Sequence, residues 1–156
     1  MTGNSISVVV PAFRAAGLLP RVLKPLMAMQ ARGEVAEVIV VDDQSPDDTA
    51  RVAESLGARV LVTPQNGGPG VARNLAADHA VGTILWFVDS DVIAWDDGAL
   101  KVAAAFADPE VGAVFGRRRE DDLRTGLDDR VDAHLLVCER GGQLSDTDVI
   151  DAEHHL

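Results

Sequence analysis

Three short apolar runs, each followed directly by a turn or polar residues, constrain the fold of this chain most strongly. The runs span 6–10, 38–41 and 84–88, and apart from Ser7 they hold only apolar residues. Continuous apolar runs of this length are typical of strands that are buried on both faces of a parallel sheet. Such a strand ends where its sheet meets solvent, so the residues after the three runs are expected at one edge of the sheet.

Segments with helical patterns lie between these runs. Apolar residues recur at helical spacing over 19–27, where Pro25 predicts a kink or an early break. Ser45 and Pro46 suit the cap and the first position of a second helix. Further helices are expected over 71–81 and 97–106, and further strands over 59–62 and 111–115. This alternation predicts an α/β fold with a mostly parallel sheet and helices on both faces.

Charge is spread unevenly along the 156 residues, whose net charge is -11. Residues 1–119 hold 14 acidic and 11 basic side chains, whereas residues 120–156 hold 11 acidic and 3 basic ones. The shift predicts an α/β domain over 1–119 and an acidic C-terminal segment over 120–156 that is irregular or partly disordered. The negative balance argues against nucleic acid as a partner.

Composition indicates a globular chain of the cytoplasm. No apolar run approaches the roughly 20 residues that span a bilayer, so no transmembrane segment is expected. The first residues also lack the pattern of a signal peptide. The single cysteine, Cys138, cannot form an internal disulfide, which is typical of a reducing compartment. Peripheral association with the inner membrane face, through an acceptor lipid or a partner, stays open.

Two carboxylates follow the apolar run 84–88, in the sequence Asp89-Ser90-Asp91. Carboxylate oxygens are hard ligands that suit Mg2+ or Mn2+, and these ions commonly carry the phosphates of a substrate. The plainer interpretation is a turn, since two acids one residue apart arise often by chance. The position after a buried strand favours a metal–nucleotide site at the edge of the sheet.

Two other strand ends carry residues that could meet these acids, Pro11-Ala12-Phe13 and Asp42-Asp43. A carboxylate just past a strand can accept hydrogen bonds from a base or a ribose. Phe13 could offer a face for stacking, although packing in the core is at least as plausible a role. The two acids could equally serve turn and cap chemistry before a helix.

Four motifs occur in order along the chain. They lie at 7–13 (SVVVPAF), 40–45 (VVDDQS), 66–74 (NGGPGVARN) and 87–91 (FVDSD). Together they resemble the nucleotide-binding half of family 2 glycosyltransferases of the GT-A fold. The usual forms there are V-V-x-P-x-[FY]-N, V-V-D-D-G-S, N-x-G-x-x-x-A-R-N and D-x-D after an apolar strand. The resemblance covers roughly residues 6–116 and departs at Arg14 and Gln44, where the family has Asn and Gly.

The resemblance implies roles for the first two motifs. Pro11, Ala12 and Phe13 would border the base of a nucleotide. Asp43 would hydrogen-bond that base, and Asp42 beside it would support the loop.

The resemblance also implies roles for the other two motifs. Arg73 and Asn74, near the start of a helix, would hold their loop near the sugar nucleotide. Asp89 and Ser90 would lie near the ribose or the sugar. Asp91, with Asp89 beside it, would ligate Mg2+ or Mn2+ bridging the diphosphate.

The activity implied by the resemblance is inverting transfer of a sugar from a nucleotide-diphosphate sugar to a glycan, lipid or protein acceptor. The family takes its catalytic base from an acidic motif well downstream. Glu120-Asp121-Asp122 looks similar but follows the last predicted strand too closely, so a solvated charged turn is the better interpretation. The catalytic base is therefore unassigned. The alternative is a non-catalytic nucleotide-sugar-binding module, or a truncated remnant without the acceptor half.

Two other classes of enzyme fit the sequence less well. Both a nucleotidyltransferase and a dinucleotide oxidoreductase need a glycine-rich loop after the first strand. Here the corresponding residues are Pro11 to Arg14, which include no glycine.

Overall fold

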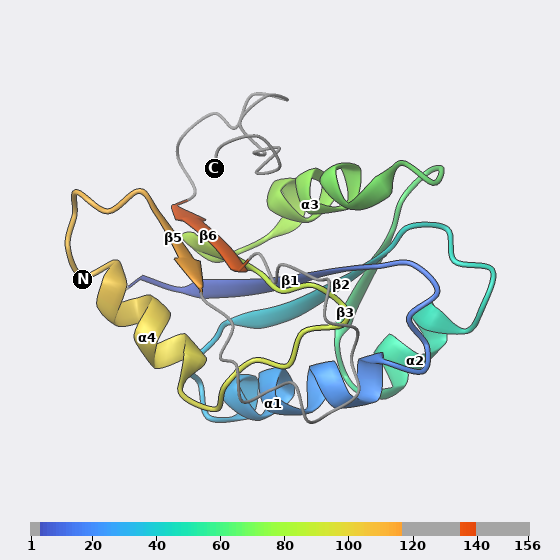
Figure 1. The fold of residues 1–156 in the computed structure, drawn as a ribbon, viewed down its shortest axis with the longest axis horizontal. Coiled ribbons are helices and arrows are strands. Elements are labelled where there is room, and N and C mark those ends of the chain that lie inside the picture. Colours follow the sequence, from blue (N-terminus) through green and yellow to red (C-terminus); the bar gives the residue numbers. More distant parts are fainter. Residues whose placement is uncertain (1–3, 117–134, 140–156) are drawn as a thin grey trace.

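The computed structural model of the chain describes residues 4–116 and 135–139, which build one six-stranded sheet with helices on both faces (Figure 1). The strand order is β3-β2-β1-β4-β6-β5. The strands are β1 (Ile6–Ala12), β2 (Glu37–Asp42), β3 (Arg59–Val62), β4 (Ile84–Phe87), β5 (Ala113–Gly116) and β6 (Leu135–Glu139). Strands β3, β2, β1 and β4 pair in parallel, whereas β6 runs antiparallel to β4 and β5. The predicted α/β fold with a mostly parallel sheet is confirmed.

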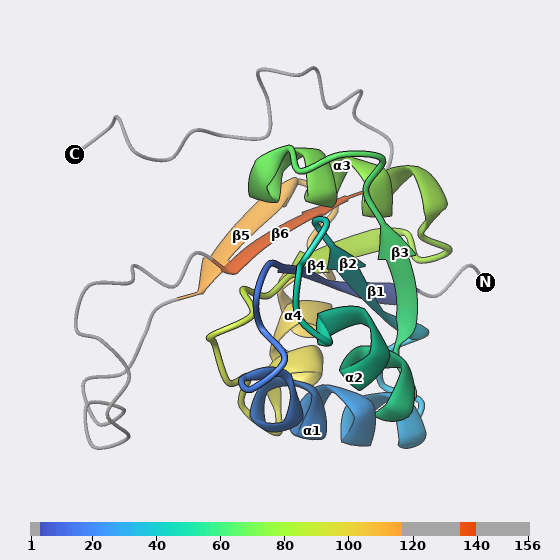
Figure 2. The same ribbon diagram turned by 90° about the vertical axis from the view of Figure 1, so that its right-hand side faces the viewer.

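Four helices form the two outer layers. They are α1 (Leu19–Ala31), α2 (Thr49–Ser55), α3 (Gly68–His79) and α4 (Gly98–Ala105). Helix α3 covers one face of the sheet, and α1, α2 and α4 cover the other (Figures 1 and 2). The predicted helices on both faces are therefore present.

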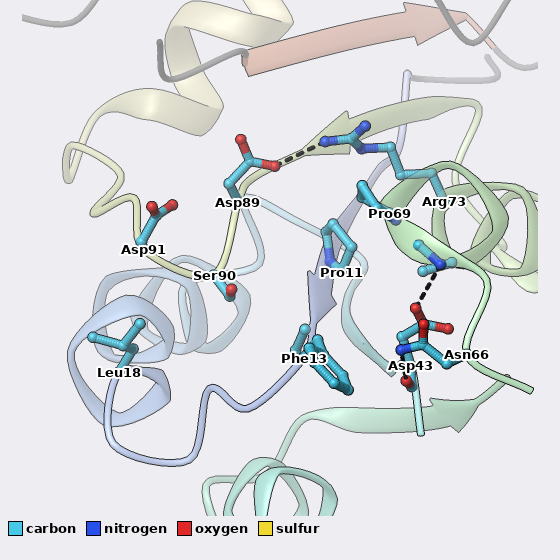
Figure 3. A pocket seen from close by; sticks show the side chains of 13 residues that line it. Pro11, Phe13, Leu18, Asp43, Asn66, Pro69, Arg73, Asp89, Ser90 and Asp91 are labelled. Carbon is cyan, nitrogen blue, oxygen red and sulfur yellow. Dashed lines mark hydrogen bonds and ion pairs between the residues drawn. The ribbon is translucent and has the colours of Figure 1, made fainter. Parts of the chain in front are cut away.

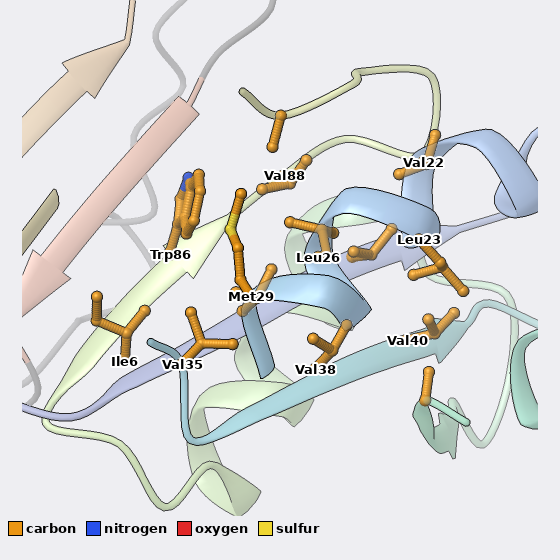
Figure 4. Close-up of a cluster of buried hydrophobic side chains, with 14 of the residues drawn as sticks. Ile6, Val22, Leu23, Leu26, Met29, Val35, Val38, Val40, Trp86 and Val88 are labelled. Carbon is orange, nitrogen blue, oxygen red and sulfur yellow. The ribbon is translucent and has the colours of Figure 1, made fainter. Parts of the chain in front are cut away.

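Alternate residues of the central strands pack against the two helix layers. Val8 and Val10 of β1 belong to the cluster under α1, whereas Val9 between them belongs to the cluster under α3. In β4, Trp86 and Phe87 divide in the same way. Figure 4 shows the larger cluster, in which Trp86 packs close to residues of α1. Burial of both strand faces explains why the sequence shows continuous apolar runs instead of alternation.

Helix α1 continues through Pro25 to Ala31, so of the predicted kink or early break the break is wrong, whereas the kink stays a prediction. An interior proline costs a helix about 3 kcal/mol. Val22, Leu23, Leu26 and Met29 are at most 2% exposed, and burying each side chain stabilises the fold by about 1.5–3 kcal/mol. Their combined burial outweighs the cost of the proline.

Helices α2 and α3 begin at other residues than predicted. Helix α2 begins at Thr49, because the Ser45 hydroxyl accepts the N–H of Arg14 instead of capping a helix. The Asp47 carboxylate accepts the N–H of Thr49 and so holds a turn before α2. Helix α3 begins at Gly68, three residues before the predicted start, since an acid outside the helix satisfies its first N–H groups.

Strand β6 falls inside the acidic segment 120–156, where the sequence predicts no regular element. It lies between β4 and β5, pairing Leu85 with Cys138 on one side and Ala113 with Cys138 on the other. A five-residue strand carries too little periodicity to be recognised without its two neighbours. The rest of that segment lies outside the described residues, and the division of the chain at residue 119 stays a prediction.

A buried polar network joins the strands at the amino end of the sheet. Glu37 is 9% exposed, and one of its carboxylate oxygens accepts the Ser7 hydroxyl (2.7 Å) and the N–H of Val81 (2.7 Å). The other oxygen pairs with Arg59 at 2.9 Å. Burial raises the pKa of Glu37, but these hydrogen bonds and the guanidinium outweigh burial and hold the pKa below its ordinary value. The network ties the chain before β4 to β1, β2 and β3.

Glu37→Gln is expected to lower the free energy of unfolding by about 2 kcal/mol, because it removes the charge that three donors share. Urea denaturation at pH 7 measures the change. Glu54→Gln, on an exposed position of α2, is the matched control and should shift the value by no more than about 0.5 kcal/mol. Equal effects of the two variants would contradict the stabilising role of the network.

Candidate functional site

A cavity of about 490 Å3 opens at the carboxyl ends of β1 and β4, beside the residues that follow β2 (Figure 3). Of the predicted site residues, Pro11, Ala12, Phe13, Asp43, Arg73, Asp89, Ser90 and Asp91 line it. Leu18, Asn66, Gly68, Pro69 and Ala72 complete the lining. The structure thus brings three strand ends and the first turn of α3 together around one cavity.

The Asp43 carboxylate holds the start of α3 in place. Residue Asp43 is only 4% exposed, and its oxygens accept the Thr63 hydroxyl (2.7 Å) and the N–H groups of Gly67 (3.0 Å) and Gly68 (2.7 Å). The first N–H groups of a helix have no partner within the helix, and a negative charge there is favourable. Burial raises the pKa of Asp43, but these hydrogen bonds outweigh burial and hold the pKa below its ordinary value.

The residues on either side of Asp43 in the sequence, Asp42 and Gln44, make hydrogen bonds that hold the loop after β2 in place. The Asp42 carboxylate is buried and accepts the N–H of Ser45 (3.2 Å). Gln44 has a φ of 60°, the left-handed conformation that glycine adopts most easily. Its side-chain amide donates to the carbonyl oxygen of Thr63. Asp42 supports the loop but does not line the cavity. Asn74, also predicted as a site residue, does not line the cavity either.

Phe13 presents its ring to the cavity and is not a core residue. The residue is 46% exposed, and the guanidinium carbon of Arg14 lies 5.3 Å from the ring centroid. A cation over an aromatic face is attracted by the ring quadrupole. The proposed packing in the core is therefore wrong, and the ring is open to a planar group that enters the cavity.

Arg73 and Asp89 form an ion pair across the cavity. The Arg73 Nη2 lies 2.9 Å from the Asp89 Oδ1, and the two side chains are 20% and 23% exposed. Figure 3 shows Asp89 reaching from the end of β4 toward Arg73 of α3, while Asp91 lies apart from this pair. Asp91 makes no side-chain hydrogen bond or ion pair with the part of the chain that the structure describes.

The carboxylates of Asp89 and Asp91 suit a divalent cation. Both line the cavity and offer hard oxygen donors. Within residues 4–116 and 135–139, no three His, Cys, Asp or Glu side chains gather into a group that could hold a metal. Mg2+ is commonly bound by one or two carboxylates, with water and substrate phosphates as its other ligands. The two acids therefore fit a cation that shares its ligands with a phosphate.

Several residues that line the cavity were not predicted from the sequence. Asn66 and Gly68 lie in one of the four motifs, and the Asn66 amide donates to the carbonyl oxygen of Asp43 at 2.9 Å. The glycine-rich composition of that motif was the available signal. Leu18, just before α1, carries no motif and is found only from the fold. The acids 120–122 lie outside the described residues.

No helix of the described part is long and apolar enough to cross a membrane.

Comparison with known sequences finds that this chain is similar to glycosyltransferases. The sequence model of the family described as "Glycosyl transferase family 2" matches residues 7–153. A 4,4'-diaponeurosporenoate glycosyltransferase of Staphylococcus haemolyticus is 40% identical over 106 residues, which are 64% of this chain and 28% of that protein. A poly(ribitol-phosphate) beta-N-acetylglucosaminyltransferase, TarS, of Staphylococcus aureus is 37% identical over 107 residues, 65% of this chain and 18% of TarS. The chain thus spans less than a third of either relative.

Solved structures share the fold and include donor complexes. The mannosyltransferase PcManGT from Pyrobaculum calidifontis, in complex with GDP-Man and Mn2+, superposes with a TM-score of 0.71 at 28% identity, over 88% of this chain and 45% of that one. S. aureus TarS 1-349 in complex with UDP-GlcNAc gives a TM-score of 0.62 at 34% identity, over 74% and 34%. The GT-A arrangement predicted for this chain is thereby confirmed.

Proposed function

Because the chain belongs to glycosyl transferase family 2, we propose that its cavity binds a nucleotide-diphosphate sugar together with Mg2+ or Mn2+. The observation that carries this proposal is the meeting of four separate motifs at one cavity, where an exposed aromatic ring and two metal-type carboxylates face the same space. Solved relatives with the same fold hold GDP-Man with Mn2+ or UDP-GlcNAc. The domain proposed to carry this site is 1–119.

The base of the donor would lie against Pro11, Ala12 and the ring of Phe13, which offers a stacking face. Asp43 would border the base; two of its neighbours, Gly67 and Gly68, already occupy much of its accepting capacity. Its main contribution would thus be to hold the loop that shapes this end of the cavity. Asn74, one residue beyond the lining, would act by holding α3 in place.

The diphosphate and sugar would lie toward the end of β4. Asp91 would hold the cation with Asp89 beside it, and Ser90 and the Arg73–Asp89 pair would border the ribose, the sugar or the phosphates. The cation would neutralise charge on the departing nucleoside diphosphate. Each of these residues comes from the third or fourth motif, so one donor would engage both.

The reaction proposed is transfer with inversion at the anomeric carbon. An acceptor hydroxyl oxygen forms a bond to that carbon, the bond from the carbon to the phosphate oxygen breaks, and the hydroxyl proton passes to a base. The described carboxylates that line the cavity, Asp43, Asp89 and Asp91, all have other proposed roles. Within the described residues no base is assigned, which keeps a donor-binding module without transfer activity as the second candidate.

Calorimetric titration of the purified chain with UDP, GDP and CMP, with and without Mn2+, tests donor binding. We expect Mn2+-dependent binding of one nucleotide, weakened about tenfold or more by Asp91→Ala. Asp78→Ala, an exposed acid of α3, is the matched control and should leave binding unchanged. A folded chain that binds none of the three nucleotides would overturn the proposal. Release of nucleoside diphosphate from the matching sugar donor would separate a transferase from a binding module.

A further inference from the structure

We propose that Arg73 is a positioning residue that withholds Asp89 from the metal, so that this chain binds a divalent cation weakly alone and tightly only with a nucleoside diphosphate. This inference rests on the proposed function, which identifies a nucleoside diphosphate as the molecule that binds together with the cation. It concerns what the two acids of the Asp89-Ser90-Asp91 turn do before any donor arrives.

The geometry gives the two acids unequal environments. The guanidinium of Arg73 donates to the Asp89 Oδ1 at 2.9 Å, and with side chains 20% and 23% exposed the pair is partly shielded from water. A fixed positive charge at this distance offsets the charge of Asp89 and repels a cation. Asp91 has no such partner in the described part of the chain, which leaves it as the one acid of the turn with its full charge.

Arg73 itself has little else to bind. Its Nε is buried without a hydrogen-bond partner among the described residues, and Asp89 is the acid with which it pairs. The side chain comes from α3, whereas Asp89 comes from the end of β4, so the pair depends on the packing of α3 across the sheet. Arg73 therefore fixes the direction of the Asp89 carboxylate from a separate element.

A single carboxylate is a poor site for a divalent cation in water. Mg2+ keeps a near-octahedral shell of oxygens and gives up its water reluctantly, so one acid retains it weakly. A nucleoside diphosphate adds two negatively charged oxygen groups to the same shell. With Asp89 held by Arg73, the donor itself becomes a main source of metal ligands, and the cation and the donor enter as one unit.

Titration of Mn2+ into the nucleotide-free chain, with the paramagnetic resonance signal of unbound Mn2+ as the readout, tests this inference without any turnover. Arg73→Gln is expected to bind Mn2+ about tenfold more tightly than the natural chain, because it releases Asp89 as a second ligand. Arg73→Lys keeps the positive charge and should behave like the natural chain. The double variant Arg73→Gln/Asp89→Asn should bind Mn2+ no more tightly than the natural chain.

The matched control is Arg51→Gln, which removes a positive charge from an exposed pair with Asp48 and should leave Mn2+ binding unchanged. Asp89→Asn alone gives a second measurement that needs no change at Arg73: the natural chain and this variant should bind Mn2+ alone equally weakly. An Arg73→Gln chain that binds Mn2+ no tighter than the natural chain overturns the inference, and so does a loss of Mn2+ affinity in Asp89→Asn. These titrations contain no nucleotide, so failure of the proposed function, seen as no nucleotide binding in calorimetry, is a separate result.

Discussion

Gly82→Ala is expected to lower the free energy of unfolding by about 3 kcal/mol, because the new methyl group has no room. A Cβ at this position would lie 2.6 Å from the backbone nitrogen of Ser7 and 2.8 Å from the carbonyl oxygen of Ser5. Both atoms belong to the backbone at the start of β1 and cannot move without disturbing the pairing of β1 with β4. The N–H of Gly82 also donates to the Ser7 hydroxyl at 2.8 Å, and that hydrogen bond would be strained.

Thermal and urea denaturation of Gly82→Ala would measure this loss. Gly112→Ala is the matched control, since no heavy atom lies within 4 Å of a Cβ built there and its φ is not positive. The control should change the free energy of unfolding by no more than about 0.5 kcal/mol. If Gly82→Ala matched the control, the close contact between the chain before β4 and the start of β1 would be refuted.

Asp43→Ala is expected to destabilise the chain by a similar amount, about 3 kcal/mol. The substitution removes the acceptor for the Thr63 hydroxyl and for the N–H groups of Gly67 and Gly68. Each buried donor left without a partner costs about 1–3 kcal/mol, and water entering the emptied space recovers part of that cost. Because these donors open α3, donor binding should weaken in the same variant, measured by calorimetry at a temperature where the chain is folded.

The pH dependence of Asp43→Asn separates the charge from the shape of the side chain. The pKa of Asp43 is lowered in the folded chain, so the carboxylate adds stability that is fully present above the ordinary Asp pKa near 4 and is lost as the pH falls through the lower folded value. The difference in unfolding free energy between the natural chain and Asp43→Asn should stay constant from about pH 7 to 5 and shrink below about pH 4. A difference that grew toward low pH would contradict the assignment. Asp78→Asn, at an exposed position of α3, is the control and should give a difference that does not change with pH.

The types of the elements could be predicted from the sequence because burial leaves a pattern. Strands β1, β2 and β4 are covered on both faces, and each therefore contains a run of consecutive apolar residues. The ends of the helices could not be predicted as well, because they depend on distant partners. Helix α3 begins at Gly68 since Asp43, far back in the sequence, accepts its first N–H groups.

The candidate site could be predicted as far as it depends on strand ends. Parallel strands bring their carboxyl ends to one edge, so Phe13, Asp43 and Asp89 were expected to meet, and they line one cavity. The sequence does not contain the pairing of Arg73 with Asp89, because that contact depends on how α3 lies across the sheet. Leu18 reaches the cavity for a similar reason, from the turn that leads into α1.

The insertion of β6 between β4 and β5 has a consequence for the time course of synthesis. Every described residue that lines the cavity lies between Pro11 and Asp91, and the parallel strands β1 to β4 end at Phe87. Strand β5 reaches the sheet only through β6, so within the described structure it stays undocked until Leu135–Glu139 has been made. Since chains emerge from the ribosome N-terminus first, the nascent chain can shape the cavity while the far side of its sheet still ends at β4. In that interval the edge of β4 is open to pairing with other chains, which makes prompt arrival of β6 a safeguard against aggregation.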